Sequence, residues 1–393
     1  MTQSLKVWLV QDIVAPYRVR LFDTIARTPG IDFRLIILAP RSRVKPQWVY
    51  SAETLPFPAE LVPGLHMFFG YSKRFSLNPR LFLRMMAERP DVVICAGYSF
   101  ATIQAFIYKL VTGKEYVIWM EGTKITEGTR RPRFLRRWQR IPLTRMAGAL
   151  VDAGTESHHY LKSLLRKDRH PPFFRSFNAV DNDYISSEAR RFTADTQAFA
   201  AFKGRFAPKN ILFVGQLIER KGVPQLLEAY RVIRERSREP VGLIMLGSGP
   251  LLDLIQAIKE RRGLEHLYIE GFIQQDVYPR YLAVADLLLL PSLHDPNPLV
   301  VFEALAAGKP IVLSERAGNA ADFVDEGRNG YVVDPLAIED MATKALAILN
   351  SSDEERDAMA RRSRELVKVA NYDDSAKGFV DAARCAAVKA QRA

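Results

Sequence analysis

The sequence predicts an α/β protein made of two doubly wound domains in series. Two observations lead to this prediction. The 393 residues exceed what one hydrophobic core usually serves. Short, fully apolar segments also alternate with helical segments twice along the chain. Such strands form parallel sheets that helices cover on both faces.

The first alternation fills the N-terminal part of the chain. A helix is expected over residues 18–26, and strands are expected at residues 6–10, 33–38, 91–95, 116–120 and 148–152. The pattern changes near residues 177–181, and a polar stretch follows at residues 186–204. We therefore expect a first domain over residues 1–180.

The second alternation runs from residue 211 to about residue 335. Its expected strands lie at residues 211–214, 241–246, 267–269, 287–290, 311–313 and 331–333. Its expected helices include residues 224–237, 251–262 and 299–307, and residues 355–392 are mostly helical in pattern. We expect a second domain over residues 181–370, with ligands bound at the carboxyl ends of the strands.

The composition is that of a soluble globular protein, with 48% hydrophobic and 25% charged residues. The two cysteines, Cys95 and Cys385, lie far apart and have no metal-ligand spacing, so reduced thiols of a cytosolic protein are expected. No secretory leader is evident, and no run of ~20 apolar residues could span a bilayer. These features predict a cytoplasmic location.

The net charge of +12 favours a polyanionic partner. Seven arginines crowd residues 130–145 with no acid among them, and aromatic and aliphatic residues separate them. This composition suits a helix lying on anionic lipid, at the inner face of the cytoplasmic membrane. A solvated basic helix face is the alternative, and nucleic acid is disfavoured because no binding motif accompanies the patch. The proposed membrane contacts are Arg133, Arg136, Arg137 and Arg140.

A turn followed by an apolar run carries the strongest chemical signal. Asp295 lies in the Pro/Asn turn, and Glu303 lies eight positions later inside the run. The fixed φ of Pro298 suits the first turn of a helix, so the amides after it should point outward and bind phosphate. These amides are those of Leu299, Val300 and Val301. Carboxylates on either side of an anion site suit a nucleotide sugar, which carries hydroxyl groups on both sides of a diphosphate.

A second signal follows the strand at residues 211–214. Gly215 at the strand end lets the backbone approach a ligand closely, and Lys221 can neutralise phosphate as a point charge. Taken alone, the segment could equally be a turn with a surface lysine. A similar strand, glycine turn and helix start recurs at Gly247 and Gly249, where ordinary turn residues are the alternative.

Together these segments resemble the retaining family 4 glycosyltransferases with the GT-B fold. The resemblance covers residues 211–335 almost continuously and includes the acidic-x7-Glu signature at 295–303. The first acid is Asp295 instead of the usual Glu, and Gln216 stands where arginine is common, so Arg220 is a candidate for the missing charge. Ala179 replaces the glycine of an Asn-Gly-Val-Asp junction, where a left-handed backbone would be strained.

The resemblance implies two Rossmann-like domains facing a central cleft. The first domain would hold the acceptor and the second the donor, while a last helix at residues 371–393 would pack back on the first domain. The donor-binding residues implied are Gly215, Gln216, Arg220, Lys221, Gly247, Gly249, Ile273, Pro298, Leu299, Val300 and Glu303.

The implied reaction is transfer of a sugar from a nucleoside diphosphate donor to an acceptor hydroxyl, with retention of configuration. Lys221 would meet the diphosphate, Glu303 the ribose hydroxyls and Asp295 the sugar hydroxyls. No cofactor and no divalent metal are expected, because no aspartate pair is arranged to hold one. The acceptor would be a saccharide or a lipid-linked saccharide of cell-surface polysaccharide synthesis. A sugar-nucleotide epimerase and a non-catalytic nucleotide-sugar-binding protein are the alternatives.

The first domain offers one catalytic candidate. Glu121 follows the strand at residues 116–120, whose carboxyl end should face the ligand. Because a phosphate would repel it, Glu121 should bond to a sugar or acceptor hydroxyl, steadied by Lys124. An ordinary strand-end carboxylate is the alternative. His158 and His159 are expected to be surface or capping residues.

Overall fold

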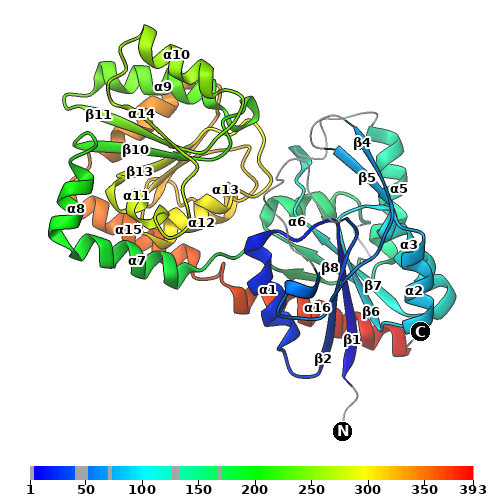
Figure 1. Cartoon of the computed structure of the whole chain (residues 1–393). Helices are drawn as coiled ribbons and strands as arrows, with labels where there is room; N and C mark the ends of the chain where they lie inside the picture. The colour runs from blue at the N-terminus through cyan, green and yellow to red at the C-terminus, as the bar shows by residue number, and fades with distance from the viewer. Residues whose placement is uncertain (1–3, 40–51, 70–72, 126–132, 167–169, 393) are drawn as a thin grey trace. The chain divides into compact units, whose positions relative to one another are not determined.

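The computed structural model describes residues 4–39, 52–69, 73–125, 133–166 and 170–392 (Figure 1). The chain divides into two compact units. Unit 1 comprises Met1–Ala179 and Ala370–Ala393, and unit 2 comprises Val180–Val369. Each unit is an α/β layer structure around its own parallel sheet, as the sequence predicts.

The described part of unit 1 forms a seven-stranded sheet in the order β3-β2-β1-β6-β7-β8-β9, with every neighbouring pair parallel. The strand order reverses between β1 and β6, which makes the carboxyl ends of these two strands the expected ligand site. The strands are β1 (Leu5–Gln11), β2 (Ile31–Ile37), β3 (Ala59–Leu61), β6 (Val92–Ala96), β7 (Glu115–Met120), β8 (Ala149–Asp152) and β9 (Phe173–Arg175).

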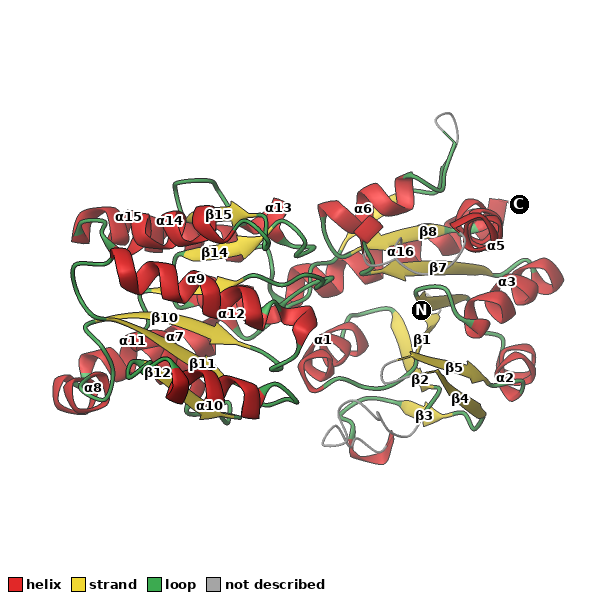
Figure 2. Cartoon of the chain, turned by 90° about the horizontal axis from the view of Figure 1, so that it is seen from above, coloured by secondary structure: helices red, strands yellow, loops and turns green. Residues whose placement is uncertain are grey.

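Helices cover both faces of this sheet (Figures 1 and 2). The strands are apolar on both sides, so Val7 and Leu9 face one core cluster while Trp8 and Val10 face the other. The first cluster includes residues of α1 (Pro16–Ala26) and α16 (Tyr372–Arg392), and the second includes residues from the remaining helices. These are α2 (Arg80–Glu88), α3 (Phe100–Thr112), α5 (Arg133–Met146) and α6 (Thr155–Lys162).

Helix α16 belongs to unit 1 although it follows unit 2 in the sequence. Small residues on its buried face allow close packing on the sheet. A Cβ at Gly378 would lie 2.1 Å from the Arg175 carbonyl oxygen, so only glycine fits there. The Phe379 ring packs edge-on against Trp119 of β7, with 5.0 Å between centroids. The last helix is therefore part of the unit 1 core.

Unit 2 has a six-stranded sheet in its described residues, in the order β12-β11-β10-β13-β14-β15, again entirely parallel. The order reverses between β10 and β13. The strands are β10 (Lys209–Val214), β11 (Val241–Leu246), β12 (Leu267–Gly271), β13 (Leu287–Leu290), β14 (Ile311–Ser314) and β15 (Gly330–Val333).

Figure 1 shows one group of helices on each face of this sheet. One face carries α9 (Val223–Arg236), α10 (Leu252–Arg261) and α14 (Ile338–Leu349). The other carries α7 (Asn182–Ala194), α11 (Tyr278–Val284), α12 (Leu299–Ala306) and α15 (Asp353–Val367). The short helices η2 (Glu219–Lys221), α8 (Thr196–Lys203) and α13 (Ala320–Phe323) complete the described elements of unit 2.

Several elements differ from the sequence-based expectation. The polar stretch at residues 186–204 forms most of helices α7 and α8. An aspartate caps the start of each helix. Asp181 accepts a hydrogen bond from the Tyr184 amide, and Asp195 accepts one from the Ala198 amide. Four short strands were also not predicted. These are the edge strands β3 and β9 and the hairpin partners β4 (Leu65–Phe69) and β5 (Lys73–Leu77), with η1 (Ala52–Thr54) before β3.

The backbone at Ala179 also differs from the expectation. Outside glycine, the one positive φ among the described residues is 50° at Arg89, so Ala179 is not left-handed. Within the same residues, no helix is both long and apolar enough to cross a membrane.

Candidate functional site

The structure brings Lys221 and Asp295 into direct contact at the carboxyl edge of the unit 2 sheet. The Lys221 ammonium forms an ion pair with Asp295 Oδ2, and the two side chains are only 14% and 8% exposed. Lys221 Cε lies 3.7 Å from the position that a Cβ atom on Gly215 would occupy. The lysine side chain therefore packs over the backbone of Gly215, at the end of β10. A buried ammonium paired in this way is pre-organised and cannot move freely into solvent.

The Asp295 backbone is fixed by the loop after β14. Its amide donates to the Arg316 carbonyl at 3.4 Å, and its own carbonyl accepts from the Gly318 amide at 2.9 Å. Arg220 ties the same turn to the loop after β10, because one of its guanidinium N–H groups donates to the His294 carbonyl at 2.7 Å. Arg220 is therefore exposed but partly committed to the protein backbone. Gln216 is half-buried in the same loop.

The glycines of these loops have a packing role that the sequence did not reveal. Gly222 has a φ of +71°, and a Cβ there would lie 1.9 Å from the Pro291 carbonyl oxygen. A Cβ at Gly247 would lie 1.9 Å from the Gly215 oxygen, and one at Gly249 would lie 2.5 Å from the Leu217 oxygen. The loops after β10, β11 and β13 can meet only because these positions lack side chains.

The start of helix α12 differs from the predicted geometry. Pro298, with φ −69° and ψ 113°, is the residue before the helix and not its first helical residue. The Val301 amide is not free, because it donates to the Pro298 carbonyl at 3.2 Å. Among the described residues, the amides of Leu299 and Val300 have no hydrogen-bond acceptor. Two amides, instead of the three expected, thus remain available to hydrogen-bond a ligand at this helix start.

Glu303 lies half-buried in α12. Burial raises the pKa of its carboxyl from 4.5 to about 7, and the hydroxyl of Tyr278 in α11 opposes this rise. Burial and the charge of Glu303 together raise the pKa of Tyr278 well above its usual range. The Tyr278 hydroxyl forms no well-aligned hydrogen bond with any described residue. A ligand hydroxyl that donated to Glu303 would stabilise its ionised form.

The region after β12 presents an aromatic side chain next to a predicted donor residue. Ile273 is half-buried, and the adjacent Phe272 is 68% exposed. Sequence reasoning did not single out Phe272, although an aromatic residue after a strand-end glycine could have drawn attention to it.

In unit 1, Glu121 has a different charge partner from the one expected. Arg18 of α1 forms an ion pair with Glu121 at 2.7 Å, and its guanidinium lies over the Trp119 ring at 4.4 Å from the centroid. Lys124, predicted to steady Glu121, lines a separate cavity. Glu121 and Arg18 line a cavity of about 240 Å³ beside Gly97, at the carboxyl ends of β6 and β7. Glu121 therefore lies at a strand-end cavity, as expected from the topology.

Arg140, one of the four predicted membrane contacts, has partners within the protein. Its guanidinium donates to the Tyr160 hydroxyl and lies over the Tyr98 ring, 4.9 Å from the centroid, so the side chain turns into unit 1. Stacking on aromatic rings satisfies an arginine without any lipid. The side chains of Arg133, Arg136 and Arg137 lie outside the described residues. Trp138 in the same helix is 65% exposed.

One charged cluster in unit 1 was not predicted. Asp152 at the end of β8 is buried, and its carboxylate pairs with His158 Nδ1 at 2.9 Å and with the Arg175 guanidinium. The surface assignment fits His159, which is 53% exposed, but not the paired His158. The sequence signal that could have indicated this pair is an aspartate at a strand end, six positions before a histidine. No group of three or more metal-ligating side chains occurs among the residues that the structure describes.

Comparison with known proteins agrees with this architecture. Residues 197–366, a little under half of the chain and all within unit 2, match the family model described as glycosyl transferases group 1. The crystal structure of HepE (Alr3699) from Anabaena in complex with UDP aligns over 96% of this chain and 99% of its own, with a TM-score of 0.73 and 16% sequence identity. The chain therefore has the GT-B fold, with two Rossmann-like units.

Two curated relatives match part of the chain. The α-D-kanosaminyltransferase of Streptomyces kanamyceticus is 28% identical over 200 residues, 50% of each chain. The GDP-mannose-dependent α-(1-6)-phosphatidylinositol monomannoside mannosyltransferase of Mycobacterium tuberculosis is 25% identical over 230 residues, 55% of this chain and 58% of its own. The chain thus spans about half the length of the curated relatives it matches. The family match and the relatives together support a GT-B glycosyltransferase.

Proposed function

We propose that this protein is a retaining glycosyltransferase that moves a sugar from a nucleoside diphosphate sugar to an acceptor hydroxyl. The observation that carries the proposal is the buried Lys221–Asp295 pair beside the α12 amides, within the segment that matches the family model. The ammonium and the two amides are complementary to a diphosphate leaving group. In this mechanism the protein acts mainly by stabilising charge that develops on the leaving diphosphate.

Each donor-site residue then has a distinct role. Lys221 neutralises the diphosphate, and Asp295 orients the ammonium and accepts hydrogen bonds from sugar hydroxyls. The amides of Leu299 and Val300 donate to phosphate oxygens. Glu303 accepts hydrogen bonds from the ribose hydroxyls, which requires its ionised form. The reaction uses no cofactor and no divalent metal in this proposal.

Unit 1 would bind the acceptor, which we propose to be a saccharide or a lipid-linked saccharide used in cell-surface polysaccharide synthesis. Glu121 would accept a hydrogen bond from a sugar or acceptor hydroxyl while Arg18 holds its carboxylate in place. Arg133, Arg136 and Arg137, from the predicted set, would hold the protein reversibly on the inner face of the cytoplasmic membrane. The relative that acts on a phosphatidylinositol mannoside is consistent with a lipid acceptor.

A panel of nucleoside diphosphate sugars tests the proposal directly. Each donor is incubated with the protein and candidate acceptors, and NMR then identifies free diphosphate, the product and the configuration of its anomeric carbon. Diphosphate release with a retained configuration supports the proposal. An epimerised donor would show a sugar-nucleotide epimerase instead. Donor binding without any product would show a non-catalytic binding protein, and an inverted product would refute retention.

A further inference from the structure

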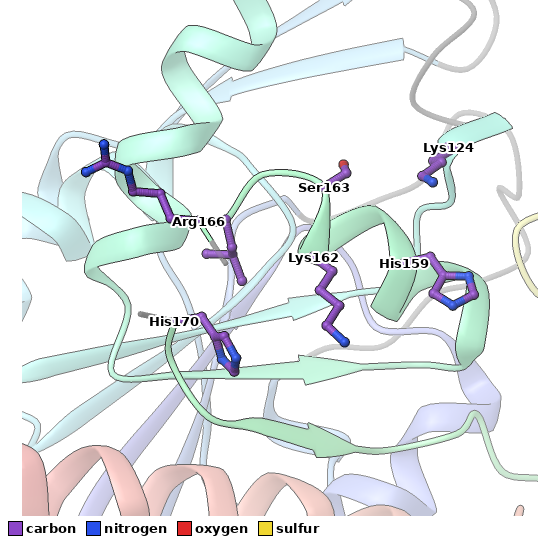
Figure 3. Close-up of a pocket in the computed structure, with 7 residues that line it drawn as sticks. Lys124, His159, Lys162, Ser163, Arg166 and His170 are labelled. Carbon is purple, nitrogen blue, oxygen red and sulfur yellow. The ribbon is translucent and has the colours of Figure 1, made fainter. Parts of the chain in front are cut away.

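A second cavity in unit 1 lies apart from the one beside Glu121. It has a volume of about 570 Å³ and is open to solvent, and its lining comes from Lys124 after β7, from α6 and from the loop that leads to β9. Figure 3 shows Lys162 extending between the rings of His159 and His170 in this view, with Lys124 at the upper right. Among the residues that the structure describes, none that lines this cavity is acidic.

The charges of this cavity are unbalanced. Lys124, Lys162 and Arg166 are the basic side chains of its described lining, and none of them forms an ion pair with a described residue. The nearby Glu156 carboxylate lies 3.6 Å from Nδ1 of His159, which is one of the residues that line the cavity. Three cations around one concavity repel one another, so an anion that enters is attracted by all of them at once.

The wall of the cavity is held in place from behind. His170 packs on Phe173 of β9, with ring centroids 5.8 Å apart, and Phe173 packs on His158 at 4.3 Å. His158 is fixed in turn by its bond to the buried Asp152. The His170 ring is therefore held against the sheet edge, which limits the ordering that a ligand would have to impose on this side chain.

We propose that this cavity binds a phosphate-bearing small molecule with at least two negative charges, such as a diphosphate or a sugar phosphate. Lys124 and Lys162 neutralise the phosphate, and the imidazole rings of His159 and His170 donate hydrogen bonds to its oxygens. The concave shape favours a compact phosphate group over the flat surface of a bilayer. Phosphate binding by this cavity is independent of the proposed function. The further statement that the bound phosphate belongs to the acceptor rests on the proposed function.

Titration calorimetry with inorganic pyrophosphate tests the proposal in the full chain. The background is Lys221→Ala, which removes the lysine of the donor site in unit 2. We expect one pyrophosphate to bind per chain in this background. Adding Lys124→Ala and Lys162→Ala should weaken the affinity at least tenfold, and raised salt should weaken binding in the parent.

A matched control removes the same charge elsewhere in unit 1. Arg27→Ala and Lys377→Ala delete two exposed cations, one directly after α1 and one in α16, whose side chains are 75% and 73% exposed. This control should bind pyrophosphate as the Lys221→Ala parent does. The proposal fails if the parent does not bind pyrophosphate, or if the cavity variant and the control bind equally.

Anionic phospholipid vesicles separate a bilayer ligand from a soluble one. If the cavity substitutions abolish vesicle binding but leave pyrophosphate binding unchanged, the cavity is a membrane contact and the proposal is wrong. Failure of the glycosyl transfer assays with pyrophosphate binding intact would refute the proposed function alone.

Discussion

Replacing Glu303 by glutamine should stabilise unit 2 above neutral pH while it weakens donor binding. Folding raises the pKa of this carboxyl from 4.5 to about 7, because burial disfavours the charge. The folded state therefore binds the proton more tightly than the unfolded state. The free energy of unfolding consequently falls as the pH rises between these two values, and the loss is complete above pH 7. At about 1.4 kcal/mol for each tenfold change in proton affinity, the loss is about 3 kcal/mol.

The Gln variant carries no titrating charge, so it should recover about 1–3 kcal/mol at pH 8 and much less at pH 5. Urea unfolding of both proteins at the two pH values measures this difference. All four tryptophans of the chain lie in unit 1, so their fluorescence follows that unit alone. Far-UV circular dichroism follows both units. The stabilisation should therefore appear in the unfolding transition of unit 2, which circular dichroism detects and tryptophan fluorescence does not.

The same substitution should reduce donor affinity about tenfold or more, because hydrogen bonds to an ionised acceptor are worth ~1.5–3 kcal/mol. In the unmodified protein, donor affinity should increase as the pH rises through 7, and in the variant this dependence should vanish. A Gln variant with no gain in stability at pH 8 and with unchanged donor affinity would refute the assignment of a buried, ligand-facing carboxyl to Glu303.

Four other outcomes are expected. Lys221→Ala should weaken donor binding and turnover together, because a phosphate contact acts in both the ground and transition states; unchanged kinetics would exclude that contact. Glu121→Gln should lower kcat with little change in donor affinity, since Glu121 is placed on the acceptor side; a collapse of donor binding with kcat intact would contradict this. Turnover should survive a chelator, and loss of activity with rescue by magnesium or manganese would overturn the metal-free mechanism. Changing Arg133, Arg136 and Arg137 to glutamine should abolish salt-sensitive pelleting with anionic vesicles, at roughly 1 kcal/mol for each basic residue near the surface. Arg140→Gln, the internal control for that set, should leave pelleting unchanged, because the Arg140 side chain packs on Tyr98 and Tyr160.

The sheets could be predicted from the sequence because their strands are continuous apolar runs. Helices α7 and α8 could not be predicted in this way, because α7 buries only Ile185 and Ala189 and α8 buries no residue. Their caps, Asp181 and Asp195, also suit a polar turn. Strands β3 and β9 are only three residues long and lie at sheet edges, where alternation carries little signal.

The sequence predicts which residues belong to the candidate site but not the contacts between them. Lys221 and Asp295 follow β10 and β13, which are neighbours at the point where the strand order reverses, so topology could have indicated their pairing. The raised pKa of Glu303 depends on burial beside Tyr278, which comes from another helix. No local pattern reports such a contact. The Arg18–Glu121 pair also joins residues far apart in sequence, whereas the sequence suggests only neighbours along the chain, such as Lys124.

The position of helix α16 has a consequence for the order in which the chain can fold during synthesis. Unit 2 is one continuous segment and can form as soon as residue 369 has left the ribosome. Unit 1 begins earlier but lacks Phe379 and the small residues that cover Trp119 until the last helix has emerged. During that interval one face of the unit 1 sheet is exposed and prone to aggregation. Of the two units, the one whose synthesis begins earlier is thus the one that completes its core later.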